Sequence, residues 1–185
     1  YVSDYAGNER AIIYHLADDV TAPKIASSYD ISYDQKNFAI TVDITDAQSG
    51  IKTVKYAIGK QDADYFRYGL RGTTLTLKDG TCSFSVGEMG VYTIYAADYR
   101  GNKTVQTINV RTVSADSLTL NASKKTLTVG ETFVLVPTLT PFDTTEKVKY
   151  STSKATVCKV NASGKLTALA PGRATITVKS SSGIK

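Results

Sequence analysis

The sequence Y-A-A-D-Y-R-G-N at residues 95–102 sets the organisation of this chain, because a related sequence, Y-V-S-D-Y-A-G-N, stands at residues 1–8. The two copies start 94 residues apart and agree at five of eight positions. In the second copy, turn formers at residues 98–102 separate two runs rich in β-branched and aromatic residues, which is typical of a β-hairpin. Such a spacing indicates repeated modules. We therefore expect residues 1–16 to be the last hairpin of one domain, residues 17–110 to be a complete domain, and a further module to follow.

The composition predicts an all-β protein. The 185 residues include 13 Gly and 12 Tyr, and 42% of them are hydrophobic, but no stretch keeps the 3.6-residue period of an amphipathic helix. Short alternating runs occur throughout the chain instead. A β-sandwich of the immunoglobulin type has about 100 residues, which is close to the spacing of the repeat. Helix should therefore be scarce.

Within residues 17–110 the alternation of apolar and polar residues predicts seven strands. They are expected near residues 24–27, 38–44, 54–58, 75–77, 82–86, 92–96 and 108–110. Residues 59–72 form a long connection, and residues 78–80 form a hairpin turn. The inward-facing positions of two antiparallel sheets predict a core that includes Phe38, Ile40, Val42, Tyr56, Phe84 and Ile94.

The charge pattern and the cysteines argue against several classes of function. The net charge of +5 is spread along the chain, whereas nucleic-acid binding usually concentrates positive charge on one face. No apolar stretch approaches the roughly 18 residues of a membrane span, so any export signal or anchor is expected outside this sequence. Cys82 and Cys158 fall in different modules and should be free thiols. A single His and the absence of a nucleophile motif leave neither a transition-metal site nor an enzyme to propose.

Residues 19–110 contain the motifs T-A-P-K-I, D-I-T-D-A-Q-S-G-I-K-T-V-K-Y-A and Y-T-I-Y-A-A-D-Y-R-G-N-K-T. On these motifs, the complete domain resembles the Ig-like repeats of bacterial surface proteins. These repeats occur in large secreted proteins of otherwise different content. The resemblance therefore implies a sandwich and an extracellular setting more firmly than it implies a binding activity.

After a linker at residues 111–116, residues 117–185 contain S-L-T-L-N, T-L-T-V-G-E-T-F-V-L-V-P-T-L-T-P and V-N-A-S-G-K-L-T-A-L-A-P-G-R-A-T-I-T-V. On these motifs, the chain closely resembles the bacterial Ig-like group 2 family, known from adhesins of the intimin and invasin type. Tyr150 stands where this family usually has Trp, and it keeps an aromatic anchor with a polar tip. Pro137 lacks an N–H and should lie at an edge or a bulge. The final strand of the family is absent from this sequence. The resemblance thus implies tandem immunoglobulin-like β-sandwiches.

Acidic residues form the strongest candidate site. In a seven-strand sandwich the N-terminus, the loop between the second and third strands and the loop between the last two strands lie at one end. Asp18, Asp19, Asp46, Asp98 and Asn102 should therefore gather at the junction with the preceding domain. Carboxylate oxygens that converge there could bind Ca²⁺ and stiffen the joint. Alternatively, Asp46 and Asp98 only accept hydrogen bonds from turn amides, and the linker acids are solvated. The predicted ligands are Asp19, Asp46 and Asp98, and calcium is the only cofactor suggested.

The aromatic residues of the long connection form a second candidate site. Tyr65 and Tyr68 lie near Arg67 and Arg71, and aromatic platforms beside polar groups are one way to bind a sugar. The alternative is that Tyr65 and Phe66 pack on the core, because a long connection between two sheets needs apolar anchors.

Together, these features predict a non-catalytic segment of a bacterial cell-surface or secreted protein. Its tandem sandwiches space or present a functional domain located elsewhere in the polypeptide, with a contribution to adhesion. The expected partners are the neighbouring Ig-like domains and, for an adhesive role, a host or cell-wall glycan. The alternative is an accessory region of a secreted carbohydrate-active enzyme that assists substrate binding. A binding module should expose an aromatic cluster on one face, whereas a spacer should bury its aromatic residues.

Overall fold

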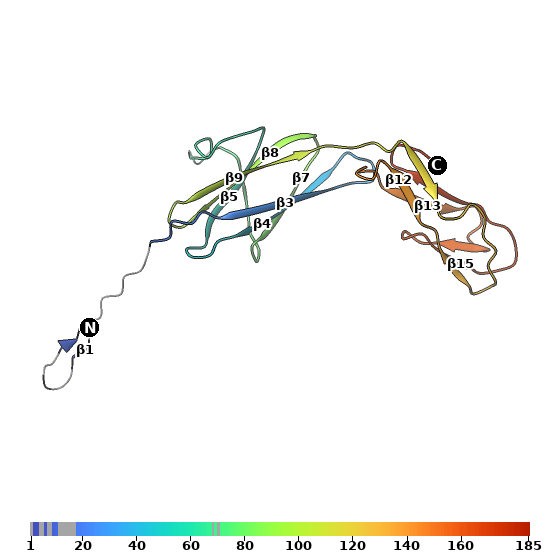
Figure 1. Cartoon of the computed structure of the whole chain (residues 1–185), viewed down its shortest axis with the longest axis horizontal. Helices are drawn as coiled ribbons and strands as arrows, with labels where there is room; N and C mark the ends of the chain where they lie inside the picture. The colour runs from blue at the N-terminus through green and yellow to red at the C-terminus, as the bar shows by residue number, and fades with distance from the viewer. Residues whose placement is uncertain (1, 4–5, 7–8, 11–17, 68, 70) are drawn as a thin grey trace.

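The chain folds into two immunoglobulin-like β-sandwiches in tandem, which confirms the predicted all-β class (Figure 1). This computed structural model describes residues 2–3, 6, 9–10, 18–67, 69 and 71–185. All regular secondary structure in these residues is β-strand. No helix in the described part of the chain is long and apolar enough to cross a membrane.

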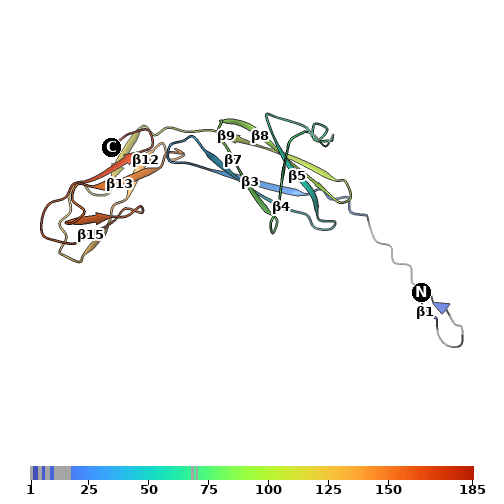
Figure 2. The same cartoon turned by 180° about the vertical axis from the view of Figure 1, so that it is seen from behind.

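The first sandwich contains the seven predicted strands in two antiparallel sheets. One sheet has the order β3-β4-β7 and contains β3 (Lys24–Ile31), β4 (Phe38–Thr45) and β7 (Thr81–Val86). The other sheet has the order β6-β5-β8-β9 and contains β6 (Thr73–Leu75), β5 (Ile51–Ile58), β8 (Gly90–Asp98) and β9 (Lys103–Val110). The two views in Figures 1 and 2 show these strands running along the length of the sandwich.

The turn at residues 78–80 differs from the predicted hairpin. Lys78 and Thr81 exchange backbone hydrogen bonds of 2.9 and 3.0 Å, and Gly80 has a φ of +80°, so the turn itself is present. However, β6 pairs with β5 and β7 pairs with β4. The turn therefore lies in the segment that passes from one sheet to the other. Leu75 and Leu77, which precede the turn, pack against the core between the two sheets.

The core between the sheets agrees with most of the predicted set. Phe38, Ile40, Val42 and Ile94 are at most 2% exposed. Tyr56 and Phe84, which were also predicted in the core, pack against it but are only half-buried. Their rings stack face to face at the edge of this core, with centroids 3.9 Å apart.

A second, smaller cluster covers the outer face of the β5–β8 sheet. Ala57, Tyr95 and Ala97 point away from the main core, yet they are 7%, 5% and 5% exposed. Residues 63–66 fold over them and place Phe66 against Tyr95, with ring centroids 4.9 Å apart. This cover explains why β8 is buried on both faces instead of alternating.

Lys55 fastens the end of this covering loop. Its side chain is 8% exposed, and its Nζ donates to the carbonyls of Gly69 and Arg71 at 3.2 and 3.4 Å. Gly72 turns the chain back with a φ of +74°. A Cβ at Gly72 would lie 2.8 Å from the Phe66 ring, so the site requires glycine.

The second sandwich is built from shorter strands in three antiparallel groups. The groups are β10 (Ser117–Leu120) with β12 (Pro137–Thr140); β11 (Thr132–Val134) with β15 (Lys165–Ala168) and β14 (Cys158–Val160); and β13 (Val148–Thr152) with β16 (Ile176–Ser180). Pro137 begins β12, which pairs only with β10, and this position confirms the expected edge location. Tyr150 is half-buried, and its hydroxyl donates to the Leu135 carbonyl at 3.4 Å.

Two short strands precede the first sandwich. β1 (Val2–Ser3) and β2 (Glu9–Arg10) pair antiparallel, with Val2 opposite Arg10. The remainder of the hairpin expected at residues 1–16 lies mostly outside the described residues.

Candidate metal site at the N-terminal end of the first sandwich

The structure brings Asp19, Asp46 and Asp98 together at the end of the first sandwich where the chain enters it. Asp19 precedes β3, Asp46 follows β4, and Asp98 is the last residue of β8. One carboxylate oxygen of each residue lies within 4.8 Å of the other two. Asp18 is exposed and does not belong to this group.

Asp98 organises the loop between β8 and β9. Its Oδ1 accepts hydrogen bonds from the amides of Arg100, Gly101 and Asn102 at 2.8, 2.6 and 2.9 Å. Its Oδ2 accepts one from the Asn102 side-chain amide at 2.8 Å. The Asp98 side chain is 0% exposed. The D-x-x-G-N sequence at residues 98–102 therefore forms a closed loop that places a buried carboxylate at the end of the sheet.

Asp19 and Asn102 tie the incoming chain to the loops. Asp19 Oδ2 accepts a hydrogen bond from the Ser49 amide at 3.0 Å, and its Oδ1 accepts from the Thr21 hydroxyl at 2.6 Å. The side-chain amide of Asn102 also donates to the Asp19 carbonyl at 2.9 Å. The segment before β3 is therefore held directly against both neighbouring loops.

Only one of the two carboxylate oxygens of Asp46 accepts hydrogen bonds. Its Oδ1 accepts hydrogen bonds from the amides of Gln48 and Gly50 at 3.1 and 2.8 Å. Its Oδ2 is buried and has no hydrogen-bond partner. A buried acceptor without a partner is costly and requires an explanation, for example a bound ion or water. As the predicted alternative expects, Asp46 and Asp98 both accept hydrogen bonds from turn amides, but these bonds leave this oxygen of Asp46 without a partner.

No basic side chain neutralises the cluster within the described residues. The only salt bridge there joins Lys147 to Asp30, and Asp30 lies on β3 near the opposite end of the sandwich. Carboxylates that crowd together without a counter-charge repel one another. Among the described residues, no ion pair therefore offsets the negative charge of this cluster.

Hydrogen bonds keep two of the carboxyl groups ionised. They lower the pKa of Asp19 to about 2, the largest cause being the bond from the Thr21 side chain. Burial alone would raise the pKa of Asp98, but the bonds from Asn102, Gly101 and Arg100 outweigh it and lower this pKa. Both groups are therefore available as negatively charged oxygen ligands at neutral pH.

The dimensions of the cluster fit a hard divalent cation. Ca²⁺ binds six to eight oxygen atoms at about 2.3–2.6 Å, so two ligands of one ion are at most about 5 Å apart. The mutual separation of the three aspartate oxygens, within 4.8 Å, satisfies this limit. Asp19, Asp46 and Asp98 would supply the charged ligands of such an ion.

The long connection carries the aromatic residues predicted to bind a sugar, of which the structure describes Tyr65. Tyr65 is half-buried, packs edge-on against Phe66 with centroids 5.1 Å apart, and has the Arg71 guanidinium 5.3 Å from its ring centroid. Its ring contributes to the cover of the β5–β8 sheet. Tyr68, the other predicted sugar ligand, lies outside the described residues.

Sequence comparison identifies a family that the second sandwich resembles. Residues 114–185 match the family model of the bacterial Ig-like domain (group 2). The second sandwich resembles this family, as predicted. The match begins within the linker expected at residues 111–116. A search of curated proteins finds no match for the chain.

Among solved structures, the chain is similar to a C-terminal 282-residue fragment of intimin, crystallised in complex with the intimin-binding domain of the translocated intimin receptor. The sequences are 16% identical, the TM-score is 0.30, and the alignment covers 89% of this chain. The chain spans 61% of the length of that fragment.

Proposed function

We propose that the chain is a non-catalytic spacer segment of a bacterial cell-surface or secreted protein, which presents a functional domain located elsewhere in the polypeptide. The observation that carries this proposal is the path of the chain. It enters the first sandwich beside Asp19 and leaves it at the opposite end, after Val110 (Figure 1). A sandwich that the chain traverses from end to end adds its length to the array, as the first sandwich does.

Small-angle X-ray scattering of the chain tests this arrangement. We expect an elongated particle in which the second sandwich follows the first, and a compact, folded-back particle would contradict the spacer function. A glycan array tests the alternative, an accessory region that assists a carbohydrate-active enzyme. The spacer predicts no specific signal. A signal that Tyr65→Ala abolishes would instead support sugar binding and an adhesive or substrate-targeting role.

We further propose that Asp19, Asp46 and Asp98 bind Ca²⁺ at the junction with the preceding module. Two of the three side chains are at most 7% exposed, and the third carries the buried oxygen without a partner. A divalent cation would supply the missing positive charge. Because Asp19 belongs to the incoming chain and the other two residues belong to the sandwich, the ion would stiffen the joint between modules.

Thermal unfolding of the chain in CaCl₂ and in EDTA tests the calcium proposal. A ligand that binds only the folded state at 100 times its Kd stabilises that state by about 2.7 kcal/mol. We therefore expect a clear rise in the melting temperature of the first sandwich in CaCl₂. Asp46→Asn should abolish this rise while retaining an oxygen acceptor for the amides of Gln48 and Gly50.

The matched control is Asp43→Asn, because Asp43 is an exposed acid on β4 that accepts a hydrogen bond from the Thr81 hydroxyl. This variant should keep the full response to CaCl₂. Equal melting of the unsubstituted chain in CaCl₂ and EDTA would overturn the calcium proposal, and it would leave the spacer function to the scattering experiment.

A further inference from the structure

We infer that the turn between β3 and β4, residues 32–37, is a docking element that locks the second sandwich at a fixed angle to the first. The linker at residues 111–116 then acts as a rigid elbow and not as a flexible tether. This inference concerns the geometry of the joint and stands whether or not the chain serves as a spacer. It rests on three sets of contacts that converge at the same end of the first sandwich.

The docking turn is held in shape before it meets its partner. Ser32 and Asn37 close it with a backbone hydrogen bond of 2.8 Å from the Ser32 amide to the Asn37 carbonyl. The Ser32 hydroxyl donates to Asp34 Oδ1 at 2.5 Å and accepts from the Asn37 amide at 3.0 Å. Such internal bonding lowers the ordering cost of a contact, because the turn is already organised.

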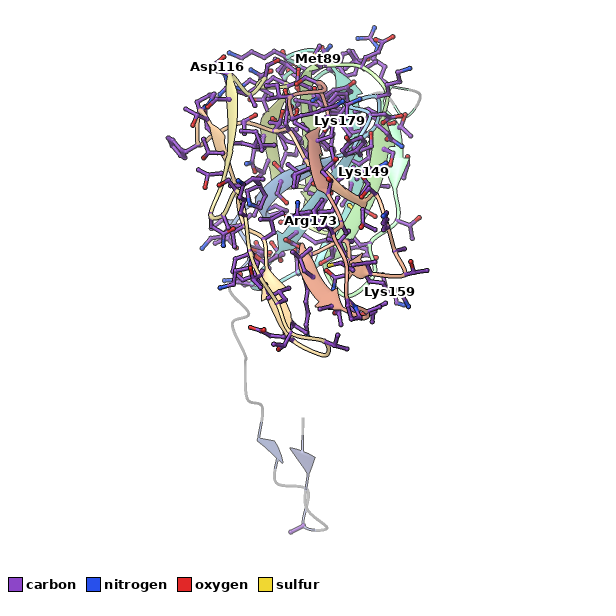
Figure 3. All side chains as sticks on the ribbon, turned by 90° about the vertical axis from the view of Figure 1, so that its right-hand side faces the viewer. Met89, Asp116, Lys149, Lys159, Arg173 and Lys179 are labelled. Atoms are coloured by element: carbon purple, nitrogen blue, oxygen red, sulfur yellow. The ribbon has the colours of Figure 1, made fainter. Side chains whose placement is uncertain are left out.

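Tyr33 forms the central contact of the joint. Its hydroxyl lies 3.0 Å from the Ser180 carbonyl and 3.3 Å from the Lys179 carbonyl at the end of β16, and it donates to them. The ammonium group of Lys149 lies 4.0 Å from the centroid of the Tyr33 ring, within the range of a cation–π interaction. Lys149 and Lys179 are directly opposite each other on β13 and β16. Figure 3 shows both side chains on this strand pair, in the view from the second sandwich.

The first half of the linker is attached to the first sandwich. The Tyr29 hydroxyl donates to the Arg111 carbonyl at 3.0 Å and accepts from the Arg111 amide at 3.3 Å. The Thr112 hydroxyl lies 3.4 Å from the sulfur of Met89. The chain is thus held at its exit from β9, on the side from which the docking turn projects.

The second half of the linker is attached to the second sandwich. The Val113 carbonyl accepts from the Thr144 hydroxyl at 2.7 Å and from the Thr145 amide at 3.0 Å. The Ala115 amide donates to the buried carboxylate of Glu146 at 2.9 Å. Bonds on alternate residues leave the linker little freedom to rotate.

A groove of about 430 Å³ remains open beside these contacts. Residues of both sandwiches line it, namely Tyr29, Asp30, Ile31, Thr144, Thr145, Glu146 and Lys147. An apolar core therefore does not seal the joint. Lys147 and Asp30 form a salt bridge of 2.7 Å at this groove, but these side chains are 44% and 75% exposed, so solvent weakens the pair. We therefore expect that removing the contacts of Tyr33 frees the second sandwich from its fixed angle to the first.

Pulsed electron paramagnetic resonance on the whole chain tests the lock. Spin labels are placed at Thr74→Cys on β6 and Lys165→Cys on β15, both exposed positions, in a Cys158→Ser background. Cys82 is 6% exposed and should not react with the label. We expect a single narrow distance distribution for this chain. Tyr33→Ala should at least double its width, because the turn loses both carbonyl contacts and the ring beneath Lys149.

Tyr33→Phe separates the two parts of the contact, because it keeps the ring and removes only the hydroxyl. It should produce an intermediate width. The control is Tyr99→Ala, a 67% exposed tyrosine in the β8–β9 loop at the opposite end of the sandwich, and it should leave the distribution unchanged. Circular dichroism checks that each variant is folded. A broad distribution in the chain with Tyr33 intact, or an unchanged width in both Tyr33 variants, would overturn the inference.

Discussion

Both domains are antiparallel β-sandwiches, but the first buries many more apolar side chains than the second. In the first, β3, β4, β5 and β9 have eight residues and β8 has nine. In the second, no strand is longer than five residues. Because side chains alternate between the faces of a strand, a longer strand contributes more residues to the core. The first sandwich accordingly has several side chains at 0% exposure, including Ile40, Val42 and Ile94.

The second sandwich relies more on polar contacts. Its buried apolar side chains are Ala115, Leu135, Leu166, Ala168 and Val178, at 3–9% exposure. Glu146 and Ser180 are buried with them, and Glu146 accepts hydrogen bonds from Ala115 and Ser182. Since burial of apolar surface dominates folding stability, we expect the second sandwich to unfold first. The following predictions test this contrast.

The largest effect is expected at the centre of the first sandwich. Phe38 is 2% exposed on the middle strand of its sheet, so Phe38→Ala should destabilise that sandwich by about 3–5 kcal/mol. Phe142 of the second sandwich is 98% exposed, and Phe142→Ala should change the free energy of unfolding by less than about 0.5 kcal/mol. Urea unfolding followed by circular dichroism measures both. Similar losses would show that Phe142 has a partner in solution.

The second sandwich should be most sensitive where its backbone packs closely. Gly164 has a φ of +78°, and a Cβ there would collide with the Leu135 carbonyl oxygen and lie 2.9 Å from the Tyr150 ring. Gly130 has a φ of +90° and open space around it. Gly164→Ala should therefore cost roughly 1–3 kcal/mol more than Gly130→Ala, which carries only the backbone strain. Equal unfolding midpoints would mean that the contact at Gly164 relaxes freely.

Acid should weaken the second sandwich through Glu146. Burial alone would raise the pKa of Glu146, but hydrogen bonds from Ala115, Ser180 and Ser182 outweigh it and lower this pKa. Its carboxylate therefore stabilises the fold above the unfolded-state pKa of about 4.3, and this contribution is lost as the pH falls through the lower folded-state pKa. Glu146→Gln should reduce the fall in melting temperature between pH 7 and pH 3. An identical fall in both proteins would assign the acid sensitivity to other groups.

The smallest effect is expected at the salt bridge between the sandwiches. Lys147→Met removes the partner of Asp30 but retains a long side chain. Because the pair is largely exposed, the loss should be below about 1 kcal/mol and should vanish in concentrated salt. Urea unfolding at low and high NaCl measures it. A loss as large as that of Gly164→Ala would show that this pair, and not Tyr33, dominates the joint.

The sequence by itself determined the fold class, the strands and the grouping of three acids. The alternation of apolar and polar residues indicates which side of each strand faces inward. The buried positions of Phe38, Ile40, Val42 and Ile94 could therefore be predicted. The convergence of Asp19, Asp46 and Asp98 followed from the order of the strands, because successive loops of an antiparallel sandwich alternate between its two ends.

Only the tertiary structure decided which surfaces meet. One example is the pairing of β6 with β5. Another is the covering loop, which packs Phe66 against Tyr95 and leaves Tyr65 half-buried. Both depend on how strands and loops pack against one another in the folded domain. The contact between Tyr33 and Ser180 joins residues 147 positions apart in the chain. Local patterns describe the two faces of each strand, whereas a contact at such separation depends on the shapes and charges of two folded surfaces. No periodic pattern in the sequence predicts such a contact.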